Sequence, residues 1–354
     1  MGCPCLFTKL LGRLRFGLER TSLWNQCSWP RDTPWARKDK RASAMGLDWV
    51  ENAWVFVTLL FVLGSIVGSF LNVCIHRIPR KESLVSPPSR CLCGERIPWR
   101  FNLPVASWLL LRGKAVCCER SIPFRYFAVE VLTGAVFAYA GLHFEDKDPY
   151  ALFMSANLFF ACILICVTFI DLEHMIIPDR LSVGGAVVGV AAAFAFPVLL
   201  GCWSDGLAAR MAGGAEALLG LLVGSGILYW VGVCAEVLLR REAIGQGDVK
   251  LLGCVGAFCG WKGALFSIFG GALVGTALLL PIALLTSRSK PAASEGEGRG
   301  EGIGWGVEVP FGPFLTLAAL LYQFGLNEYV DGYFQQFVAI LQIAWRDSGF
   351  FNPW

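Results

Sequence analysis

The sequence predicts an all-α polytopic membrane protein, with about eight transmembrane helices and one cytoplasmic loop domain that contains cysteines. Of the 354 residues, 55% are hydrophobic and only 16% are charged, and the mean hydropathy is +0.57. Several uncharged runs reach or approach the roughly 20 residues that span a hydrocarbon core, most clearly 53–73 and 151–170. One such run could be a buried helix, but a long series of them indicates a chain that crosses a bilayer repeatedly.

The N-terminal extension, residues 1–44, has a different character, with nine Lys or Arg against three Asp or Glu and no apolar span. It could be a basic arm on the membrane surface, a targeting segment, or sequence upstream of the true start. A signal peptide is disfavoured because the extension lacks an apolar core. Met45 leads directly into the first span, and we expect translation to begin there.

The first transmembrane region, 45–73, is followed by the polar loop 74–125. The many Arg and Lys residues of this loop place it in the cytoplasm by the positive-inside rule. The second transmembrane region, 126–326, contains a flexible polar connection at 287–308, and the chain ends in the tail 327–354. We expect the later spans near 126–142, 151–170, 181–203, 215–239, 251–261, 264–286 and 309–326.

Two acidic residues stand at the ends of apolar runs, where a charged side chain is costly and marks a functional-site candidate. Asp171 follows the run 151–170, and Asp248 lies between two further runs, preceded by Gly245 and Gly247. Counting spans from the cytoplasmic loop brings both aspartates to the cytoplasmic side, at the ends of neighbouring helices. The two glycines allow the backbone to bend and another peptide chain to approach it closely.

Two carboxyl groups held a few ångströms apart share a proton, so one can take a proton from water while the other donates to a peptide carbonyl. This chemistry of aspartic proteases requires neither a metal nor a covalent intermediate. Charge placement alone leaves alternatives open. The aspartates could cap helices or pair with Arg180 and Lys250, or they could relay protons in a proton-coupled transporter. A membrane scaffold without catalysis is disfavoured by the two aspartates themselves.

Six motifs occur in order between the expected spans: 68–73 with Arg77 and Pro79, 101–113, Arg125-Tyr126 with Glu130, Ile170-Asp171 with Pro178-Asp179, 245–251, and 310–314. Together they resemble the type IV prepilin peptidases, a family of GxGD-type intramembrane aspartyl proteases. The resemblance covers nearly all of the chain after Met45. A lone GxGD would be weak evidence, but six ordered motifs are specific. A presenilin-like protease, which shares GxGD, would be expected to carry Tyr-Asp where Ile170-Asp171 stands.

The resemblance implies cleavage of the short, charged leader of prepilins or pseudopilins just after a Gly, on the cytoplasmic face of the bacterial inner membrane. Such substrates serve a pilus, a type II-like secretion system or DNA uptake, and no nucleic-acid partner is expected. Many family members then methylate the new N-terminal residue, using S-adenosylmethionine. Asp171 and Asp248 fall on the family's two catalytic aspartates. The residues expected to shape the site around them are Gly245, Gly247, Lys250, Pro310, Gly312 and Pro313.

The cytoplasmic loop contains Cys91 and Cys93 and, further on, Cys117 and Cys118. Four thiolates can hold a zinc ion tetrahedrally in a reducing cytoplasm, and many family members carry two CxxC pairs that are taken to do so. This chain has CxC and CC instead, with Ala115 where a family cysteine would align, and adjacent cysteines chelate one ion awkwardly. Zinc at the four cysteines and a metal-free loop with free or disulfide-prone thiols both stay open. Since the family's methylation is linked to this loop, the departure bears on that activity too.

Four further charged or titratable residues have simpler interpretations. Asp179, directly after Pro178, is expected to cap the helix that follows. Glu173 is expected to be solvated or paired with His174. Lys250 could bias the proton affinity of the aspartates or contact lipid phosphates, and His76 is expected to be an ordinary residue at the membrane boundary.

Overall fold

The computed structural model describes residues 48–86, 91, 93–95, 103–143, 150–202, 206–240, 244–288 and 310–347. The extension 1–44, Met45 and nearly all of the connection 287–308 lie outside these residues. Across the described ranges the chain is all-α, as the sequence predicts, with one isolated β-bridge between Lys114 and Ser121. The helices in chain order are α3 (Asp48–Arg77), α4 (Ala106–Leu110), α5 (Phe124–His143), α6 (Tyr150–His174), α7 (Asp179–Ala195), η3 (Pro197–Leu200), α8 (Leu207–Leu239), α9 (Gln246–Arg288), α10 (Gly312–Leu321), η4 (Tyr322–Leu326) and α11 (Asn327–Asp347).

Five of the described helices, α3, α5, α6, α8 and α9, are long and apolar enough to cross a membrane. The chain is therefore a multi-pass membrane protein. The larger number of spans expected from the sequence is not confirmed in the described ranges, because α7 has only 17 residues and α10 only 10. Helices of that length are shorter than the roughly 20 residues that a perpendicular span requires.

Two of the expected spans have different bounds in the structure. The span expected at 181–203 ends early, since α7 stops at Ala195 and Pro197 begins the short 3₁₀-helix η3. A proline cannot donate the backbone hydrogen bond that would continue the helix. The span expected at 215–239 is only the later part of α8, which begins at Leu207.

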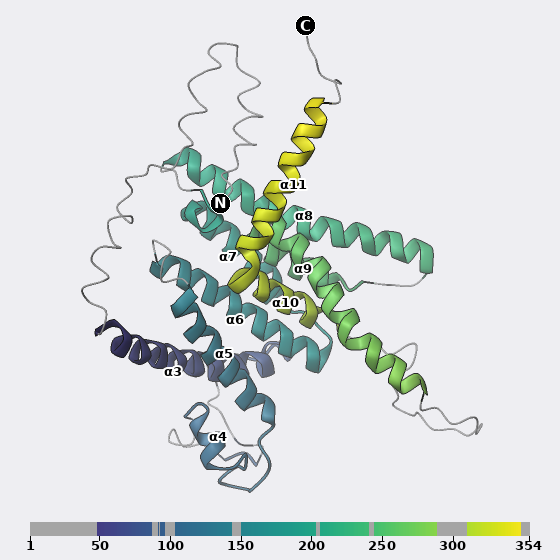
Figure 1. Ribbon diagram of the computed structural model, residues 1–354. Coiled ribbons are helices and arrows are strands. Elements are labelled where there is room, and N and C mark those ends of the chain that lie inside the picture. Colours follow the sequence, from purple (N-terminus) through teal and green to yellow (C-terminus); the bar gives the residue numbers. More distant parts are fainter. Residues whose placement is uncertain are drawn as a thin grey trace, which may run out of the picture.

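Helix α6 lies at the centre of the bundle (Figure 1). Of the most apolar stretch of α6, 56% is buried inside the protein. The buried share of the corresponding stretch is 28% in α3 and α9 and 22% in α8. Phe160 and Leu164 of α6 are fully buried in one cluster with Leu252 of α9 and Leu315 of α10. The outer helices instead present large apolar side chains outwards, such as Leu222 and Trp230 of α8, as expected where lipid replaces water.

Helices α3 and α5 form a close pair through small residues. A Cβ atom added to Gly64 would lie 2.7 Å from Phe137 Cβ, and one added to Gly68 would lie 2.8 Å from Glu130 Cα. Because real side chains do not tolerate such contacts, these two positions require glycine. The backbones of α3 and α5 therefore come close together, as at other small-residue interfaces in membranes.

Helix α9 contains a sharp break at Gly260, whose φ of 68° and ψ of 179° are not helical. A Cβ on Gly224 of α8 would lie 2.7 Å from the Leu252 carbonyl oxygen and 3.0 Å from Ala264 Cβ. Residues on both sides of the break thus flank one point of α8, so the chain reverses at Gly260. The two segments expected at 251–261 and 264–286 are both present, the first beginning earlier, at Gln246. A positive φ of this kind favours glycine.

The C-terminal helices continue one another through a π-helical turn. Helix α10 passes into η4, and η4 passes into α11, which extends away from the bundle towards the C-terminus (Figure 1). Tyr322 and Phe324 of η4 are buried, whereas Tyr329 and Tyr333 of α11 are 78% and 70% exposed. The first turns of α11 still contact the bundle through Val330, Asp331 and Phe334, and the exposure of the helix increases beyond them.

We expect Gly220→Ala to destabilise the bundle, because a Cβ there would overlap the backbone carbonyl of Gly256 on α9. Overpacking of this kind costs roughly 1–3 kcal/mol. Gly226→Ala is the matched control on the same helix, since an added Cβ there meets no atom within 4 Å. Thermal unfolding in one detergent should give a lower Tm for the first variant alone, and equal Tm values would contradict the close approach of α8 and α9.

Candidate functional site

Asp171 lies in the last turn of α6, with only 5% of its surface exposed. Its Oδ2 atom is buried and accepts no hydrogen bond of good geometry from the described residues, although the Gly312 backbone faces the carboxylate. A Cβ on Gly312 would lie 2.5 Å from that oxygen. Glycine at the start of α10 therefore leaves the room in which this carboxyl group sits.

Asp248 lies in the first turn of α9, where the helix dipole favours a negative charge. Its backbone N–H donates to the Gly245 carbonyl over 3.1 Å, and a Cβ on Gly245 would lie 3.5 Å from Asp248 Oδ2. The carboxyl groups of Asp248 and Asp171 are close enough to interact electrostatically. The fold thus brings together the two aspartates that the sequence singles out.

Ile177, in the loop between α6 and α7, joins the two glycine-containing segments. A Cβ on Gly247 would lie 3.0 Å from Ile177 Cβ, and one on Gly312 would lie 3.3 Å from Ile177 Cδ1. The start of α9 and the start of α10 therefore pack against one side chain that follows Asp171 by six positions in the sequence. Pro310 and Pro313 stand on either side of Gly312, and Pro313 opens α10, a position that tolerates proline because its missing N–H has no partner there.

One turn deeper in the bundle, a pair of hydroxyls fixes α6 to α10. Thr168 Oγ1 and Thr316 Oγ1 are 2.6 Å apart, and either hydroxyl can donate to the other. Each hydroxyl also lies within donating distance of a backbone carbonyl, that of Leu164 for Thr168 and that of Pro313 for Thr316. Thr316 is 1% exposed, so the contact is shielded from water. The pair holds Asp171 and Gly312 in register, because each hydroxyl lies about one turn from one of them.

The structure gives partners to three charged residues near the aspartates and corrects the role expected for one of them. Asp179 does not cap α7: Pro178 occupies the cap position, and Asp179, in the first turn, accepts a hydrogen bond from Lys250 Nζ over 2.7 Å. Lys250 therefore has a protein partner in Asp179. Glu173 lies within ion-pair distance of His174 Nε2, at 3.9 Å, as expected, and it also pairs with Arg125 of α5.

Taken together, the ends of α6, α9 and α10 surround two interacting carboxyl groups in an apolar setting. Two carboxyl groups that approach each other closely can share a proton, so that one accepts a proton from water while the other donates to a carbonyl oxygen. Sequence reasoning did not identify Thr168, Thr316 or Ile177. Nothing local distinguishes these residues from other side chains of an apolar run, and only the packing of three helix ends reveals them.

The four loop cysteines converge on one point. Their Sγ atoms all lie within 4.8 Å of one another, with Cys91 and Cys118 3.5 Å apart and Cys93 and Cys117 3.3 Å apart. Four thiolates bound tetrahedrally at about 2.3 Å from a zinc ion would be separated by about 3.8 Å. The cluster therefore fits a metal of this kind, despite the CxC and CC spacing.

Two turns facing each other explain this convergence. Around the first pair, the Cys91 N–H donates to the Glu95 carbonyl, and Gly94 has a φ of 90°. Around the second pair, the Ile122 N–H donates to the Gly113 carbonyl over 2.7 Å and closes a short hairpin. Each turn contributes two thiols, and each thiol of the first turn contacts one thiol of the second, Cys91 with Cys118 and Cys93 with Cys117.

The backbone N–H of Cys93, together with the thiols of Cys117 and Cys118, lowers the pKa of the Cys91 thiol to about 7. Hydrogen bonding with Cys91 and Cys93 raises the pKa of Cys117. A thiol whose pKa is near neutrality is readily deprotonated, which is the form that binds metals.

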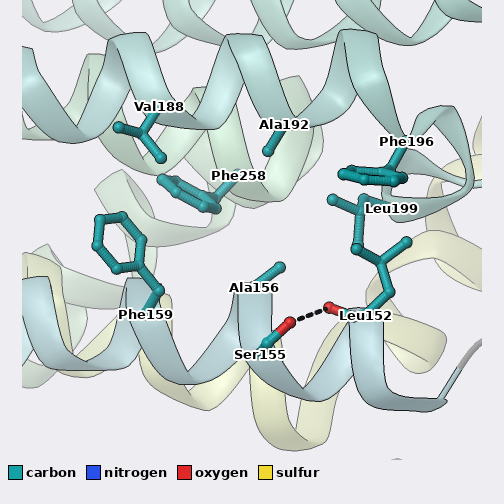
Figure 2. Close-up of a pocket in the computed structure, with 9 residues that line it drawn as sticks. All are labelled: Leu152, Ser155, Ala156, Phe159, Val188, Ala192, Phe196, Leu199 and Phe258. Carbon is teal, nitrogen blue, oxygen red and sulfur yellow. Dashed lines mark hydrogen bonds between the residues drawn. The ribbon is translucent and has the colours of Figure 1, made fainter.

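A separate apolar cavity of about 210 Å³ lies between α6, α7 and η3, with Phe258 of α9 at one wall (Figure 2). The hydrogen bond drawn between its lining residues joins the Ser155 hydroxyl to the Leu152 carbonyl. None of the described residues that line it is titratable. Leu152 is near the start of α6 whereas Asp171 is near its end, so this cavity is not the candidate site.

Two family models match the chain. Residues 62–144 match the bacterial peptidase A24 N-terminal domain, and residues 158–280 match the type IV leader peptidase family. The second match contains Asp171 and Asp248, while the first contains the four cysteines.

Curated relatives carry the same description, prepilin leader peptidase/N-methyltransferase. The protein of Myxococcus xanthus is 35% identical over 249 residues, covering 69% of each chain. That of Dichelobacter nodosus is 33% identical over 298 residues, covering 75% of this chain and 90% of its own. That of Stutzerimonas stutzeri is 32% identical over 295 residues, with the same coverage. No solved structure matches the chain.

Proposed function

Because this chain belongs to the type IV leader peptidase family, we propose that it is a membrane-embedded aspartyl endopeptidase that removes the leader peptide from prepilins or pseudopilins. Cleavage follows a Gly, on the cytoplasmic side of the bacterial inner membrane. The observation that carries the assignment is the meeting of Asp171 and Asp248 at the joined ends of α6, α9 and α10.

The two aspartates act as one unit in this mechanism. One carboxylate takes a proton from water, and the protonated partner donates a hydrogen bond and then a proton to the scissile carbonyl. The oxygen of water forms the new bond to carbon, and the peptide nitrogen leaves as an amine after it receives a proton. Neither a metal nor a covalent enzyme intermediate enters these steps.

The residues around the pair position it. Gly245 and Gly247 leave the backbone before Asp248 open to an approaching peptide, and Gly312 makes room for Asp171. Lys250 ties α9 to α7 through Asp179, while Pro310 and Pro313 set the start of α10. A transporter using the same aspartates would give no reason for these glycines beside both carboxyl groups, and the family comparisons favour the peptidase.

We also propose that the enzyme methylates the new N-terminal amine, with S-adenosylmethionine as the methyl donor. The support is the name of the relatives, which includes N-methyltransferase. We assign a zinc ion to Cys91, Cys93, Cys117 and Cys118, where it would hold the two turns of the loop together. The support is the mutual distance of the four thiols.

Asp171→Ala and Asp248→Ala should each abolish leader removal, because neither carboxyl group alone can both accept and donate a proton. Asp179→Asn should keep activity within about fivefold of wild type, since an exposed ion pair contributes at most about 1 kcal/mol. Mass spectrometry of a prepilin co-expressed with each variant measures this. Complete processing by either alanine variant would refute the catalytic pair.

Gly312→Ala tests the position of Asp171. The added Cβ would push against Oδ2, and a displacement of about 1 Å at a reacting group can lower the rate about 100-fold. Gly332→Ala, whose Cβ would meet no atom within 4 Å, should cleave like wild type. Cleavage rates of the two purified variants decide the matter, and an unaffected Gly312→Ala would show that Asp171 is not held by this contact.

Purified protein should contain a single zinc ion, and Cys117→Ser should lose most of it because three thiolates hold the ion less tightly. Cys234→Ser is the matched control, since Cys234 is an exposed thiol on α8 outside the cluster. Elemental analysis after purification under reducing conditions measures the zinc. A wild-type protein that remains metal-free when supplied with zinc would contradict the site.

A further inference from the structure

We propose that Asn72 of α3 and Glu130 of α5 form the site that receives the α-amine of the cleaved product and takes its proton before methyl transfer. This inference rests on the proposed methyltransferase function and deepens it. It assigns a location and a proton acceptor to a reaction that the two aspartates do not explain. The ligand is a primary ammonium group at the end of a membrane-embedded helix.

Polar side chains gather in an otherwise apolar interface between α3 and α5. Glu130 is 9% exposed, and its Oε2 accepts the Val105 N–H over 2.7 Å. The Ser69 hydroxyl also donates to this carboxylate, and Gly68 lies directly against Glu130 Cα. A carboxylate buried in a membrane helix is costly to maintain, so Glu130 is a candidate for function rather than packing alone.

Asn72 supplies an acceptor that the protein leaves unused. Its Nδ2 donates to the Tyr126 carbonyl over 3.0 Å, so the orientation of the carboxamide is set. Its Oδ1 atom is buried and finds no hydrogen-bond partner in the described part of the chain. The residue is 3% exposed. A buried polar atom without a partner is unfavourable, and a bound donor would remove that cost.

The cluster lies beside the end of α6 that carries Asp171. Tyr126, which holds Asn72, directly follows Arg125, and Arg125 binds Glu173, two positions after Asp171. Glu130 is little more than one turn further along α5. A product helix released at the aspartates therefore needs to shift only laterally within the membrane to bring its new N-terminus to this cluster.

The loop closes over the cluster in a strained conformation. Val105 has a φ of 60° and a ψ of −53°, values that are costly for a β-branched residue. Its N–H is the one held by Glu130, and Trp108 of the same segment stacks on Phe127 with ring centroids 4.7 Å apart. Strain of this kind is tolerated where the surrounding contacts enforce it, and it concentrates at functional sites.

The chemistry of the cluster selects a cation. Two donors occupy Glu130, yet a carboxylate offers about four acceptor positions. The remaining acceptor positions of Glu130 and the unused Asn72 Oδ1 offer a ligand only acceptors, which suits an ammonium group. The ammonium must lose one proton before its nitrogen can act, and Glu130 receives it. The nitrogen lone pair then bonds to the methyl carbon of S-adenosylmethionine, the carbon–sulfur bond breaks, and the sulfonium becomes a neutral thioether.

Glu130→Gln is the decisive variant, because glutamine keeps an oxygen for the Val105 N–H but cannot accept the proton. Glu82→Gln, at an exposed loop carboxylate, is the matched control. Each full-length enzyme is assayed in nanodiscs with an uncleaved prepilin and, separately, with the cleaved pilin and S-adenosylmethionine. Mass spectrometry scores cleavage and methylation independently, and equilibrium dialysis measures binding of labelled S-adenosylmethionine.

We expect Glu130→Gln to cleave prepilin like wild type, to bind S-adenosylmethionine unchanged, and to methylate about 100-fold or more slowly, as on loss of a general base. Its remaining methylation should rise steeply with pH up to about 8, where an α-amine loses its proton in solution. The wild-type rate should depend less on pH over this range. Asn72→Leu should raise the KM for the cleaved pilin and leave cleavage intact.

Four results would overturn the assignment. Methylation by Glu130→Gln at the wild-type rate would remove its role, and loss of S-adenosylmethionine binding would place the donor there instead of the amine. Loss of both cleavage and methylation together with a lower Tm would show that Glu130 only stabilises the fold. A wild-type enzyme that cleaves but never methylates would instead refute the proposed methyltransferase function itself, and this site with it.

Discussion

The electrostatic coupling of Asp171 and Asp248 is the interaction on which the rest of this structure depends. A single carboxylate in an apolar bundle is unfavourable, and a second one nearby is more so unless the two share a proton. The fold meets this condition by placing both at helix ends, where α6, α9 and α10 converge. Neighbouring charges in the described ranges are neutralised in pairs, Lys250 with Asp179 and Arg125 with Glu173, which leaves the two aspartates to each other.

Small residues make that convergence possible. Glycine allows backbone to touch a carboxyl group at Gly312 and backbone to touch backbone where Gly220 meets Gly256. The reversal at Gly260 lets α9 begin at the site, pack along α8 and then turn back. Because side chains supply no hydrophobic driving force between helices in lipid, close packing of this kind is the main source of specificity in the bundle.

The N-terminal unit is attached to the catalytic helix by polar contacts rather than by the apolar core alone. The cysteine cluster organises the loop, Trp108 and Val105 seat the loop on α5, and Arg125 joins α5 to the end of α6. This continuity places the N-terminal unit, which has its own family match, against the end of the helix that carries Asp171. The two proposed activities would then use two neighbouring positions rather than two distant sites.

The sequence by itself determined the all-α membrane character and the two aspartates with their glycines, because a charge beside a long apolar run is conspicuous. It did not determine the number of spans. It also did not reveal that Asp179 pairs with Lys250, because the position of Asp179 after a proline is typical of a helix cap. Only the tertiary structure decided that Gly312 touches Asp171 and that four irregularly spaced cysteines share one centre. The physical reason is that such contacts join residues far apart in the chain, and their energies depend on distances that no local pattern of residues encodes.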